Sequence, residues 1–371
     1  MAASRSKKKV RYAVVGLGHI AQVAVLPAFE NTKNSELVAI VSDDPTKRDE
    51  LSKKYSLQHA YSYDQFDECL TSGEIDAVYI ALPNHMHCEY TVRAAQAGVH
   101  VLCEKPMAVT EEECQQMIDA CRQRGVKLMI AYRLHTEEAN LKAVEIVQSG
   151  QIGEPRIFNS LFTMQVKEGD TRVRTETGGG TLYDIGIYCI NAARYLFQDE
   201  PIEVVAFTAA ADGDERFREV EEMASVVMRF PKERLATFTC SFGAADVSMY
   251  QVAGTKGDLR VDPAYEYQGK LAHRLTIDGQ TTKKTFRRRD QFGAEIMYFS
   301  NCILQDTEPE PSGEEGLLDV RIIRALYRSA EAGELVQLEP VDRLQRPTIA
   351  QEIELPPVSK PELVHAESPS E

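Results

Sequence analysis

Three polar residues of this chain have types and spacings suited to moving a hydride and a proton. Lys105 follows Glu104 and precedes a proline, and Asp184 and Tyr188 lie four residues apart in a later segment. Removing hydride from an alcohol requires a base for the hydroxyl proton and a cation beside the developing alkoxide. A phenol with a pKa near ~10 is a poor base at neutral pH, but a neighbouring ammonium favours the phenolate. Tyr188 and Lys105 can divide these tasks, and Asp184 can orient substrate hydroxyls or fix Lys105.

The spacing of the later residues predicts a helix. Asp184, Tyr188 and Asn191 are four and three residues apart, which places them on one helix face. The alternative is a helix whose polar side meets water. The glycine-rich segment 178–180 before this helix and its adjoining apolar face favour burial at a domain junction instead. For Lys105 the alternative is an exposed lysine at the end of a strand.

A glycine-rich turn is the second chemical signal. The apolar run 10–15 reads as a buried strand and is followed by Gly16-Leu17-Gly18-His19-Ile20-Ala21 and a helical segment. Gly16 permits a tight turn, and Gly18 lets backbone N–H groups approach a pyrophosphate at the helix N-terminus. Ala21 replaces the third glycine. This context favours dinucleotide binding over a plain strand-to-helix turn.

The end of the second predicted strand indicates the choice between NADP and NAD. An acidic residue there would bind the ribose 2′-hydroxyl and repel a 2′-phosphate. Ser42 occupies this position if it is the terminal strand residue, and Lys47 and Arg48 supply positive charge one turn away. We therefore predict NADP, with NAD less favoured. The prediction reverses if Asp43 turns inward.

The segment His85-Met86-His87-Cys88 superficially resembles a metal site. It follows a strand and opens a helix, and no fourth ligand is close in sequence. We predict no metal, and interpret His87 as packing at a helix start near the cofactor.

These residues are positioned by two predicted domains. Short apolar strands near 37–41, 75–82, 99–103 and 127–131 alternate with helical stretches, which is typical of a doubly wound parallel α/β (Rossmann) sheet. A capping box at Thr110 predicts a helix just after the Lys105 loop, so this loop lies at the carboxyl end of a strand, where such sheets bind ligands.

The pattern changes to alternating strands from about residue 155, with examples at 224–230, 235–242 and 250–254, which predicts an α+β domain with a large open, mostly antiparallel sheet. The expected boundaries are a flexible N-terminus at 1–9, a nucleotide-binding domain at 10–133, a substrate and oligomerisation domain at 134–338, and a proline-rich tail at 339–371 that lies on the surface or is disordered.

Composition excludes several classes of function. The chain has 371 residues and a net charge of −15, which argues against nucleic acid or an anionic membrane as the main partner. The basic run 283–289 reads as a solvated strand end. No apolar stretch is long enough for a signal peptide or a membrane span, and the eight cysteines form no Cys-x-x-Cys pair, so we expect a cytoplasmic protein.

These motifs together resemble the glucose-fructose oxidoreductase / inositol dehydrogenase (Gfo/Idh/MocA) family, over roughly residues 10–340, and within it the glucose-fructose oxidoreductases. The motifs that carry the resemblance are Gly-Leu-Gly-His-Ile-Ala (16–21), Val-Tyr-Ile-Ala-Leu-Pro-Asn (78–84), Cys-Glu-Lys-Pro-Met-Ala (103–108), Tyr-Arg-Leu-His (132–135), the segment 178–188 and Gly-Glu-Glu-Gly-Leu-Leu-Asp-Val-Arg (313–321).

The resemblance implies roles for particular residues. Lys105 would lie beside the nicotinamide, Tyr188 would transfer the proton, Arg133 would lie near the cofactor or sugar, and Tyr267 would line the sugar pocket. We expect substrate contacts from Lys105, Arg133, Asp184, Tyr188 and Tyr267. We expect cofactor contacts from the following residues: Gly16, Gly18, His19, Ile20, Ser42, Lys47, Arg48, Leu82, Pro83, Asn84, His87, Glu104, Lys105 and Arg133.

The expected function is an NADP-dependent aldose oxidoreductase that converts the C1 hydroxyl to an aldonolactone, with a second sugar available to reoxidise the cofactor. One alternative is an inositol, xylose or cyclic-diol dehydrogenase that releases reduced cofactor. Another is a non-catalytic NADP-binding regulator, against which the intact Lys105, Asp184 and Tyr188 argue. A homodimer or homotetramer is expected, because the second sheet needs cover on its outer face.

Two features depart from the family pattern. Thr171-Arg172 stands where relatives often have Trp-Arg, and the chain has no tryptophan. The segment before the first strand has only nine residues, without the long arm that helps retain NADP in glucose-fructose oxidoreductase.

Overall fold

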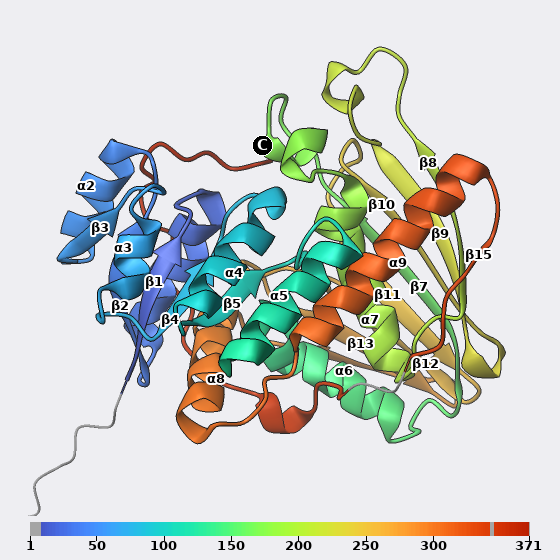
Figure 1. Ribbon diagram of the computed structural model, residues 1–371. Helices are drawn as coiled ribbons and strands as arrows, with labels where there is room; N and C mark the ends of the chain where they lie inside the picture. The colour runs from blue at the N-terminus through green and yellow to red at the C-terminus, as the bar shows by residue number, and fades with distance from the viewer. Residues whose placement is uncertain (1–8, 342–344, 371) are drawn as a thin grey trace, which may run out of the picture.

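A six-stranded, fully parallel sheet forms the first domain of the computed structural model, which describes residues 9–341 and 345–370 (Figure 1). Its order is β3-β2-β1-β4-β5-β6. The strands are β1 (Val10–Val15), β2 (Ser35–Val41), β3 (His59–Tyr61), β4 (Ala77–Ile80), β5 (His100–Glu104) and β6 (Leu128–Ala131). The predicted doubly wound sheet is confirmed. Only β3 had no counterpart in the prediction, because its three half-buried residues form no apolar run.

Helices cover both faces of this sheet. Those of the first domain are α1 (Leu26–Ala28), α2 (Pro45–Lys54), α3 (Phe66–Thr71), α4 (His87–Gln96) and α5 (Glu111–Arg124). Helices α4 and α5 pack together on one face, and α8 (Gln291–Gln305), far along the chain, packs on the other against β1, β2 and β5. The capping box predicted at Thr110 is present, and α5 begins directly after it.

The second domain contains a nine-stranded mixed sheet with the order β14-β13-β12-β11-β7-β10-β9-β8-β15. The strands are β7 (Pro155–Thr163), β8 (Glu203–Ala209), β9 (Met223–Phe230), β10 (Arg234–Ser241), β11 (Val247–Gly254), β12 (Gly257–Val261), β13 (Ala272–Ile277), β14 (Gln280–Thr285) and β15 (Val336–Gln337). Of the neighbouring strands, β7 and β10 run parallel and the others run antiparallel. The prediction of a mostly antiparallel sheet is therefore confirmed.

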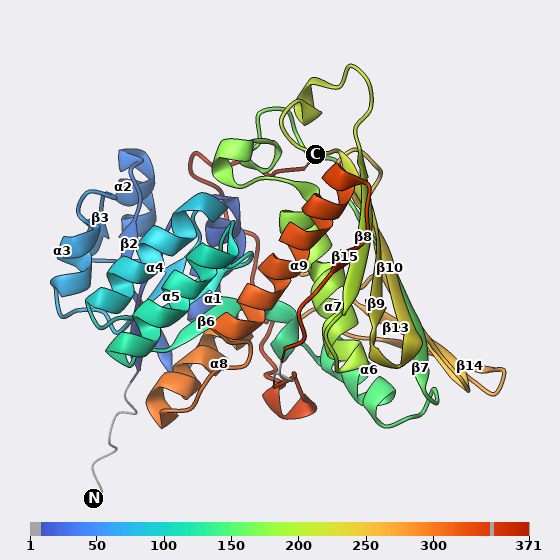
Figure 2. The ribbon, with the colours of Figure 1, turned by 45° about the vertical axis from the view of Figure 1, so that its right-hand side comes forward.

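Three helices lie between the two sheets, namely α6 (Glu138–Gln148), α7 (Ile187–Phe197) and α9 (Gly313–Ala332) (Figure 2). Helix α9 crosses from α5 and β6 of the first domain to β8 of the second. The guanidinium of Arg194 on α7 is fully buried and pairs with Glu315 and Asp319 on α9. This ion pair network fixes α7, which carries candidate site residues, to the helix that joins the domains.

Two other regions had specific expectations. The basic run lies at the exposed end of β14, where residues 280–285 are all exposed and Phe286 turns inward. The proline-rich tail contacts both domains: Arg346 pairs with Glu200 and Glu315, Pro356 accepts a hydrogen bond from Asn31, and Leu355 is buried. Across residues 9–341 and 345–370, no helix is both long and apolar enough to span a membrane.

Candidate active site

A cleft of about 590 Å³ lies between the carboxyl ends of the parallel strands and the second sheet. Its walls come from the glycine turn, the loops after β4, β5 and β6, the loop at 171–185, and the loop at 265–268. Open parallel sheets bind ligands at this edge. The volume falls in the range of small-molecule and cofactor sites.

Lys105 and Asp184 form an ion pair at the centre of the cleft. The Lys105 Nζ atom lies 2.8 Å from both the Oδ1 atom and the backbone oxygen of Asp184. Arg172 donates from Nε to the other carboxylate oxygen of Asp184 at 2.7 Å, and also pairs with Asp170. The carboxylate of Asp184 is thus held between two cations, which leaves it available to position Lys105 more than to accept a proton.

Burial and charge oppose one another at this pair. Burial acts to lower the pKa of Lys105, but negative charge around it, chiefly the carboxylate of Asp184, outweighs burial and raises that pKa above its ordinary value. Burial acts to raise the pKa of Asp184, but Arg172 and Lys105 outweigh it and hold that pKa well below its usual range. Lys105 is therefore an ammonium at neutral pH, suited to stabilise negative charge on a substrate oxygen.

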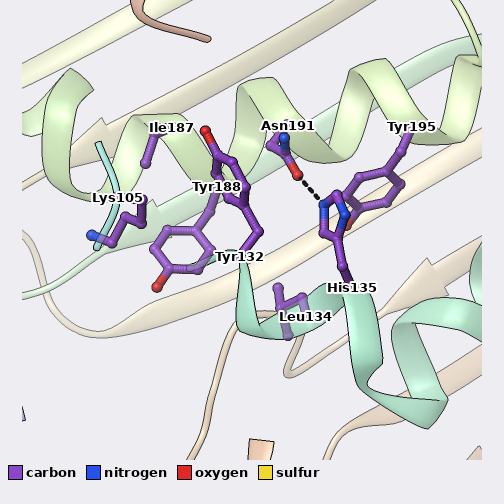
Figure 3. A pocket seen from close by; sticks show the side chains of 8 residues that line it. All are labelled: Lys105, Tyr132, Leu134, His135, Ile187, Tyr188, Asn191 and Tyr195. Carbon is purple, nitrogen blue, oxygen red and sulfur yellow. Dashed lines mark hydrogen bonds between the residues drawn. The ribbon is translucent and has the colours of Figure 1, made fainter. Parts of the chain in front are cut away.

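Tyr188 reaches the same place from the first turn of α7 (Figure 3). The Nζ atom of Lys105 lies 5.1 Å from the centre of its ring, and the guanidinium carbon of Arg133 lies 5.0 Å from it. Its ring also contacts Phe162 and Tyr265. Two cations therefore flank the ring of Tyr188 at cation–π distance.

Asn191 shares this helix face but points away from the cleft. It lies beside a small cavity of about 10 Å³ and accepts a hydrogen bond on Oδ1 from His135 Nε2 at 2.7 Å (Figure 3). Its amide nitrogen donates to Glu315 and Asp319. The predicted polar helix face is thus divided: Asp184 and Tyr188 face the cleft, and Asn191 is buried in the network between the domains.

Arg133 is anchored from two sides. Its guanidinium donates to the side chain of Gln291 and, at 2.6 Å, to the backbone oxygen of Tyr265. It also lies over the ring of Tyr267, 5.4 Å from its centre. Arg133 therefore connects the loop after β6 to the loop that carries Tyr267, and both side chains line the cleft.

The glycine turn lies directly against the loop after β4. Gly16 has φ +92°, and a Cβ atom there would lie 2.5 Å from the backbone oxygen of Ala81. Only glycine fits this approach. Asn84, in the same loop as Ala81, donates to the backbone oxygen of Gly178 at 2.8 Å and so ties this wall to the glycine-rich segment of the second domain.

His87 braces two of these loops. It is fully buried, with its ring nitrogens 2.8 Å from the backbone oxygen of Leu82 and 2.9 Å from that of Pro106. Burial lowers the pKa of His87. Both nitrogens are thus occupied within the protein, and among the described parts of the chain no cluster of three or more His, Cys, Asp or Glu residues is arranged to hold a metal ion.

The end of β2 is arranged as the sequence prediction of NADP requires. The strand ends at Val41, and Ser42 follows it as a buried residue. Asp43 is exposed and accepts a hydrogen bond at 2.7 Å from the backbone N–H of Tyr63, after β3. Arg48 donates to the backbone oxygen of Ser42. A serine and a guanidinium therefore occupy the position at which a carboxylate would bind a ribose 2′-hydroxyl.

The cleft brings together most of the candidate residues. The following line it: Gly18, His19, Ile20, Leu82, Pro83, Asn84, Glu104, Lys105, Arg133, Asp184, Tyr188 and Tyr267. Outside this lining are Gly16, Ser42, Lys47, Arg48 and His87. Gly16 and His87 support the walls, Ser42 follows β2, and Lys47 and Arg48 lie in the first turn of α2.

Arg172 is a site residue that did not enter the sequence-based set. The feature of the sequence that points to it is its place six residues before Gly178, in the Thr171-Arg172 pair that stands where relatives often have Trp-Arg. Its role depends on a bend in the chain, because three close-packed glycines fold segment 171–180 back on itself: the N–H of Gly180 donates to the backbone oxygen of Arg172 at 2.9 Å.

Comparison with known proteins agrees with this architecture. Residues 10–132 match the GFO/IDH/MocA oxidoreductase family with its NAD-binding Rossmann fold, and residues 140–260 match the GFO/IDH/MocA C-terminal domain. The chain is 35% identical over 338 residues to the D-xylose 1-dehydrogenase (NADP(+)) of Haloarcula marismortui, covering 89% of this chain and 93% of that protein.

Solved structures give the same result. The aldose-aldose oxidoreductase from Caulobacter crescentus, complexed with glycerol, superposes with a TM-score of 0.86 and 38% identity, covering 89% of this chain and 100% of that one. A 3-ketoreductase from Actinomadura kijaniata, solved with NADP and TDP-benzene, has a TM-score of 0.79 and 26% identity, covering 87% and 98%. The chain belongs to the GFO/IDH/MocA oxidoreductase family.

Proposed function

We propose that the protein is an NADP-dependent aldose oxidoreductase that oxidises the C1 hydroxyl of a cyclic aldose to an aldonolactone. The observation that carries this proposal is the group of Lys105, Asp184 and Arg172 beside Tyr188, at the carboxyl ends of the parallel strands. The glycine turn and the cleft fit a dinucleotide, and bound NADP+ supplies the hydride acceptor.

The residues of the chain handle the oxygen of the substrate. Tyr188 accepts the proton of the C1 hydroxyl as the C1 hydrogen leaves with its electron pair, and the C1–O bond becomes a carbonyl. The Lys105 ammonium stabilises the negative charge that develops on this oxygen. Asp184 and Arg172 keep Lys105 charged and in place. The products are the lactone, reduced cofactor and one proton.

NADP is favoured over NAD by the end of β2. Ser42 leaves room for a 2′-phosphate, Asp43 is bonded to the N–H of Tyr63, and Lys47 and Arg48 are close enough in sequence to supply charge. Charge-assisted contacts to phosphate correspond to a preference of about tenfold to a thousandfold. Titration of the protein with both cofactors measures it, and equal affinity would mean that Asp43 sets the choice.

Single-turnover hydride transfer, followed at the absorbance of reduced nicotinamide, tests the assignment of the catalytic groups. Tyr188→Phe and Lys105→Met are each expected to slow transfer by about a hundredfold to ten-thousandfold while NADP(H) affinity stays nearly unchanged. The losses in the double variant should not add, because the two residues act as a unit.

Controls for this experiment replace the same residue types elsewhere. Tyr298→Phe on α8 and Lys283→Met on β14 lie outside the cleft and are expected to keep the wild-type rate. If Tyr188→Phe transfers hydride as fast as the wild type, the proton goes to another group and the assignment fails.

A dehydrogenase acting on xylose is the second candidate, favoured by the similarity to the D-xylose 1-dehydrogenase (NADP(+)) of Haloarcula marismortui. It uses the same residues and differs in releasing reduced cofactor at each turnover. The two are distinguished by adding D-xylose or D-glucose to the NADP+-loaded protein and then a second sugar: bleaching of the reduced-nicotinamide absorbance by the second sugar supports coupled aldose chemistry.

We further propose a homo-oligomer assembled through the outer face of the nine-stranded sheet. Helices cover only the face toward the first domain in Figure 2, and large apolar side chains are exposed on the strands. These are Ile157, Phe207, Val227, Leu235 and Val247. A patch of this kind on a protein surface favours a protein contact.

All eight cysteines are free and buried, which favours a reducing compartment such as the cytosol.

A further inference from the structure

The C-terminal strap, residues 358–370, connects the two domains across the cleft. It appears in Figures 1 and 2 as the dark red segment that runs from the nucleotide-binding domain to the point marked C. At one end, the side chain of Gln22 and the backbone of Val364 exchange two hydrogen bonds of 2.8 Å. At the other, Lys167 N donates to Pro369 O at 2.9 Å, and Val166 forms an antiparallel bridge with Ser370.

The anchors on the first domain lie beside the elements expected to hold the nucleotide. Gln22 is buried in the helical segment that follows the glycine turn, and also donates to the backbone oxygen of Leu17 within that turn. His365 lies 3.0 Å from Asp44, the residue that caps α2, and Lys54 donates to the backbone oxygen of Glu362. The strap therefore passes the glycine turn and the start of α2.

The strap forms part of the wall of the cleft. Lys360, Ser368, Pro369 and Ser370 line the same space as Gly18 and Lys105. Lys360 is exposed and forms no ion pair with any described residue. Lys360 lines the cleft together with Gly18 and His19 of the glycine turn, and its positive charge contributes, after burial and Arg172, to the lowered pKa of His19.

We propose that the C-terminal strap is part of the cofactor site: it encloses bound NADP(H), and Lys360 supplies positive charge to the phosphates. This inference rests on the proposed function for the identity of the ligand. A cofactor in the cleft has the first domain on one side and the strap over the opening. Release then requires the C-terminal end of the strap to leave Val166 and Lys167 of the second domain, so the strap governs the rate of release more than the rate of chemistry.

A slow release has a consequence for turnover. Reduced cofactor that stays in the cleft must be reoxidised there, by a second substrate with a carbonyl carbon that takes the hydride while its oxygen takes a proton. An enzyme that exchanges cofactor at every turnover would need the strap to open each time.

The rate of NADPH release, measured by the fluorescence change when excess NADP+ displaces it, tests the strap. Removal of residues 358–371 is expected to speed release about tenfold or more. Lys360→Ala should speed release by a smaller, salt-dependent factor. Lys283→Ala, an exposed lysine on β14, is the matched control and should release NADPH at the wild-type rate.

A covalent lock tests the same proposal in the opposite direction. Cα atoms of antiparallel bridge partners are about 4.5–5.5 Å apart, which suits a disulfide. The double variant Val166→Cys with Ser370→Cys should therefore release NADPH more slowly when oxidised and at the wild-type rate after reduction. Val166→Cys alone is the control, and the native cysteines are all buried.

The outcomes distinguish a failure of the proposal about the strap from a failure of the proposed function. Equal rates of NADPH release from the full chain, the truncated chain and the locked chain would overturn the proposal that the strap encloses the cofactor, even if all three bind NADP(H) and oxidise sugar. If the full chain binds no NADP(H), the proposed function fails first. Should the truncated chain not fold, release from the oxidised and reduced locked variant decides the question.

Discussion

At the scale of single residues, the site depends on one carboxylate shared by two cations. Asp184 accepts hydrogen bonds from Lys105 on one oxygen and Arg172 on the other. Burial acts to lower the pKa of Lys105, and Asp184 is the main group that raises it. A buried ammonium kept charged in this way can stabilise an alkoxide without supplying its own proton.

Asp184→Asn should therefore move the alkaline limit of activity. The pKa of Lys105 is raised by Asp184, so the ammonium is lost as pH rises through this pKa. Without the carboxylate, less negative charge opposes the effect of burial, and the loss occurs at lower pH. The alkaline limb of the pH–rate profile for hydride transfer is expected to shift to lower pH.

Asp170→Asn is the matched control for this measurement. Asp170 pairs with Arg172 and is not among the groups that raise the pKa of Lys105, so its replacement should leave the alkaline limb in place. An unchanged profile in Asp184→Asn would show that Lys105 does not depend on this carboxylate.

At the scale of elements, close backbone packing places the loops around the cleft. The glycine segment 178–180 begins with a residue at φ +76°, and a Cβ atom on Gly178 would lie 2.6 Å from a methyl group of Val109 and 3.0 Å from Asn84 Cβ. The loops after β4 and β5 and the segment before α7 therefore pack without space for a side chain. This contact sets where Arg172 and Asp184 stand relative to Lys105.

Gly178→Ala is expected to lower sugar turnover by about tenfold to a hundredfold, because a displacement of about 1 Å in a positioned group has an effect of this size. Gly73→Ala is a matched control, since Gly73 has φ +74° with nothing within 4 Å of a Cβ atom. Both variants acquire similar backbone strain, of roughly 1–2 kcal/mol in unfolding free energy. Equal turnover in the two variants would contradict the role of the Gly178 contact in positioning Arg172 and Asp184.

At the scale of the whole molecule, the two sheets have different roles. The parallel sheet presents strand ends and loops to the cleft, and the mixed sheet packs helices on one face and exposes apolar side chains on the other. Val227 and Leu235 lie on neighbouring strands β9 and β10, and Leu235 is paired with Ile157 of β7. The exposed apolar residues thus follow several adjacent strands, as an assembly surface does.

Val227→Asp combined with Leu235→Asp should dissociate the oligomer, because burying unpaired carboxylates at a contact is strongly unfavourable. Light scattering at micromolar concentration is expected to give the monomer mass for this variant and a multiple of it for the wild type. Leu304→Asp, at a leucine with 41% exposure on α8, is the control and should keep the wild-type mass. A monomeric wild-type protein would contradict the proposed assembly.

The sequence by itself determined the features that depend on near neighbours. The strand of residues 10–15, its glycine turn and the capping box at Thr110 were predicted from local pattern and are present. Hydrophobic period, turn chemistry and caps act over a few residues, so a sequence displays them directly. The same motifs, read together, identified the family.

Only the tertiary structure decided which side chains meet. Arg172 reaches Asp184 through a bend of the chain, Asn191 turns into the core because α9 places carboxylates there, and Asp43 turns outward to the N–H of Tyr63. The strap joins Val364 to Gln22 across 342 positions. Such contacts are set by the packing of segments far apart in the chain, and spacing within one segment carries no record of them.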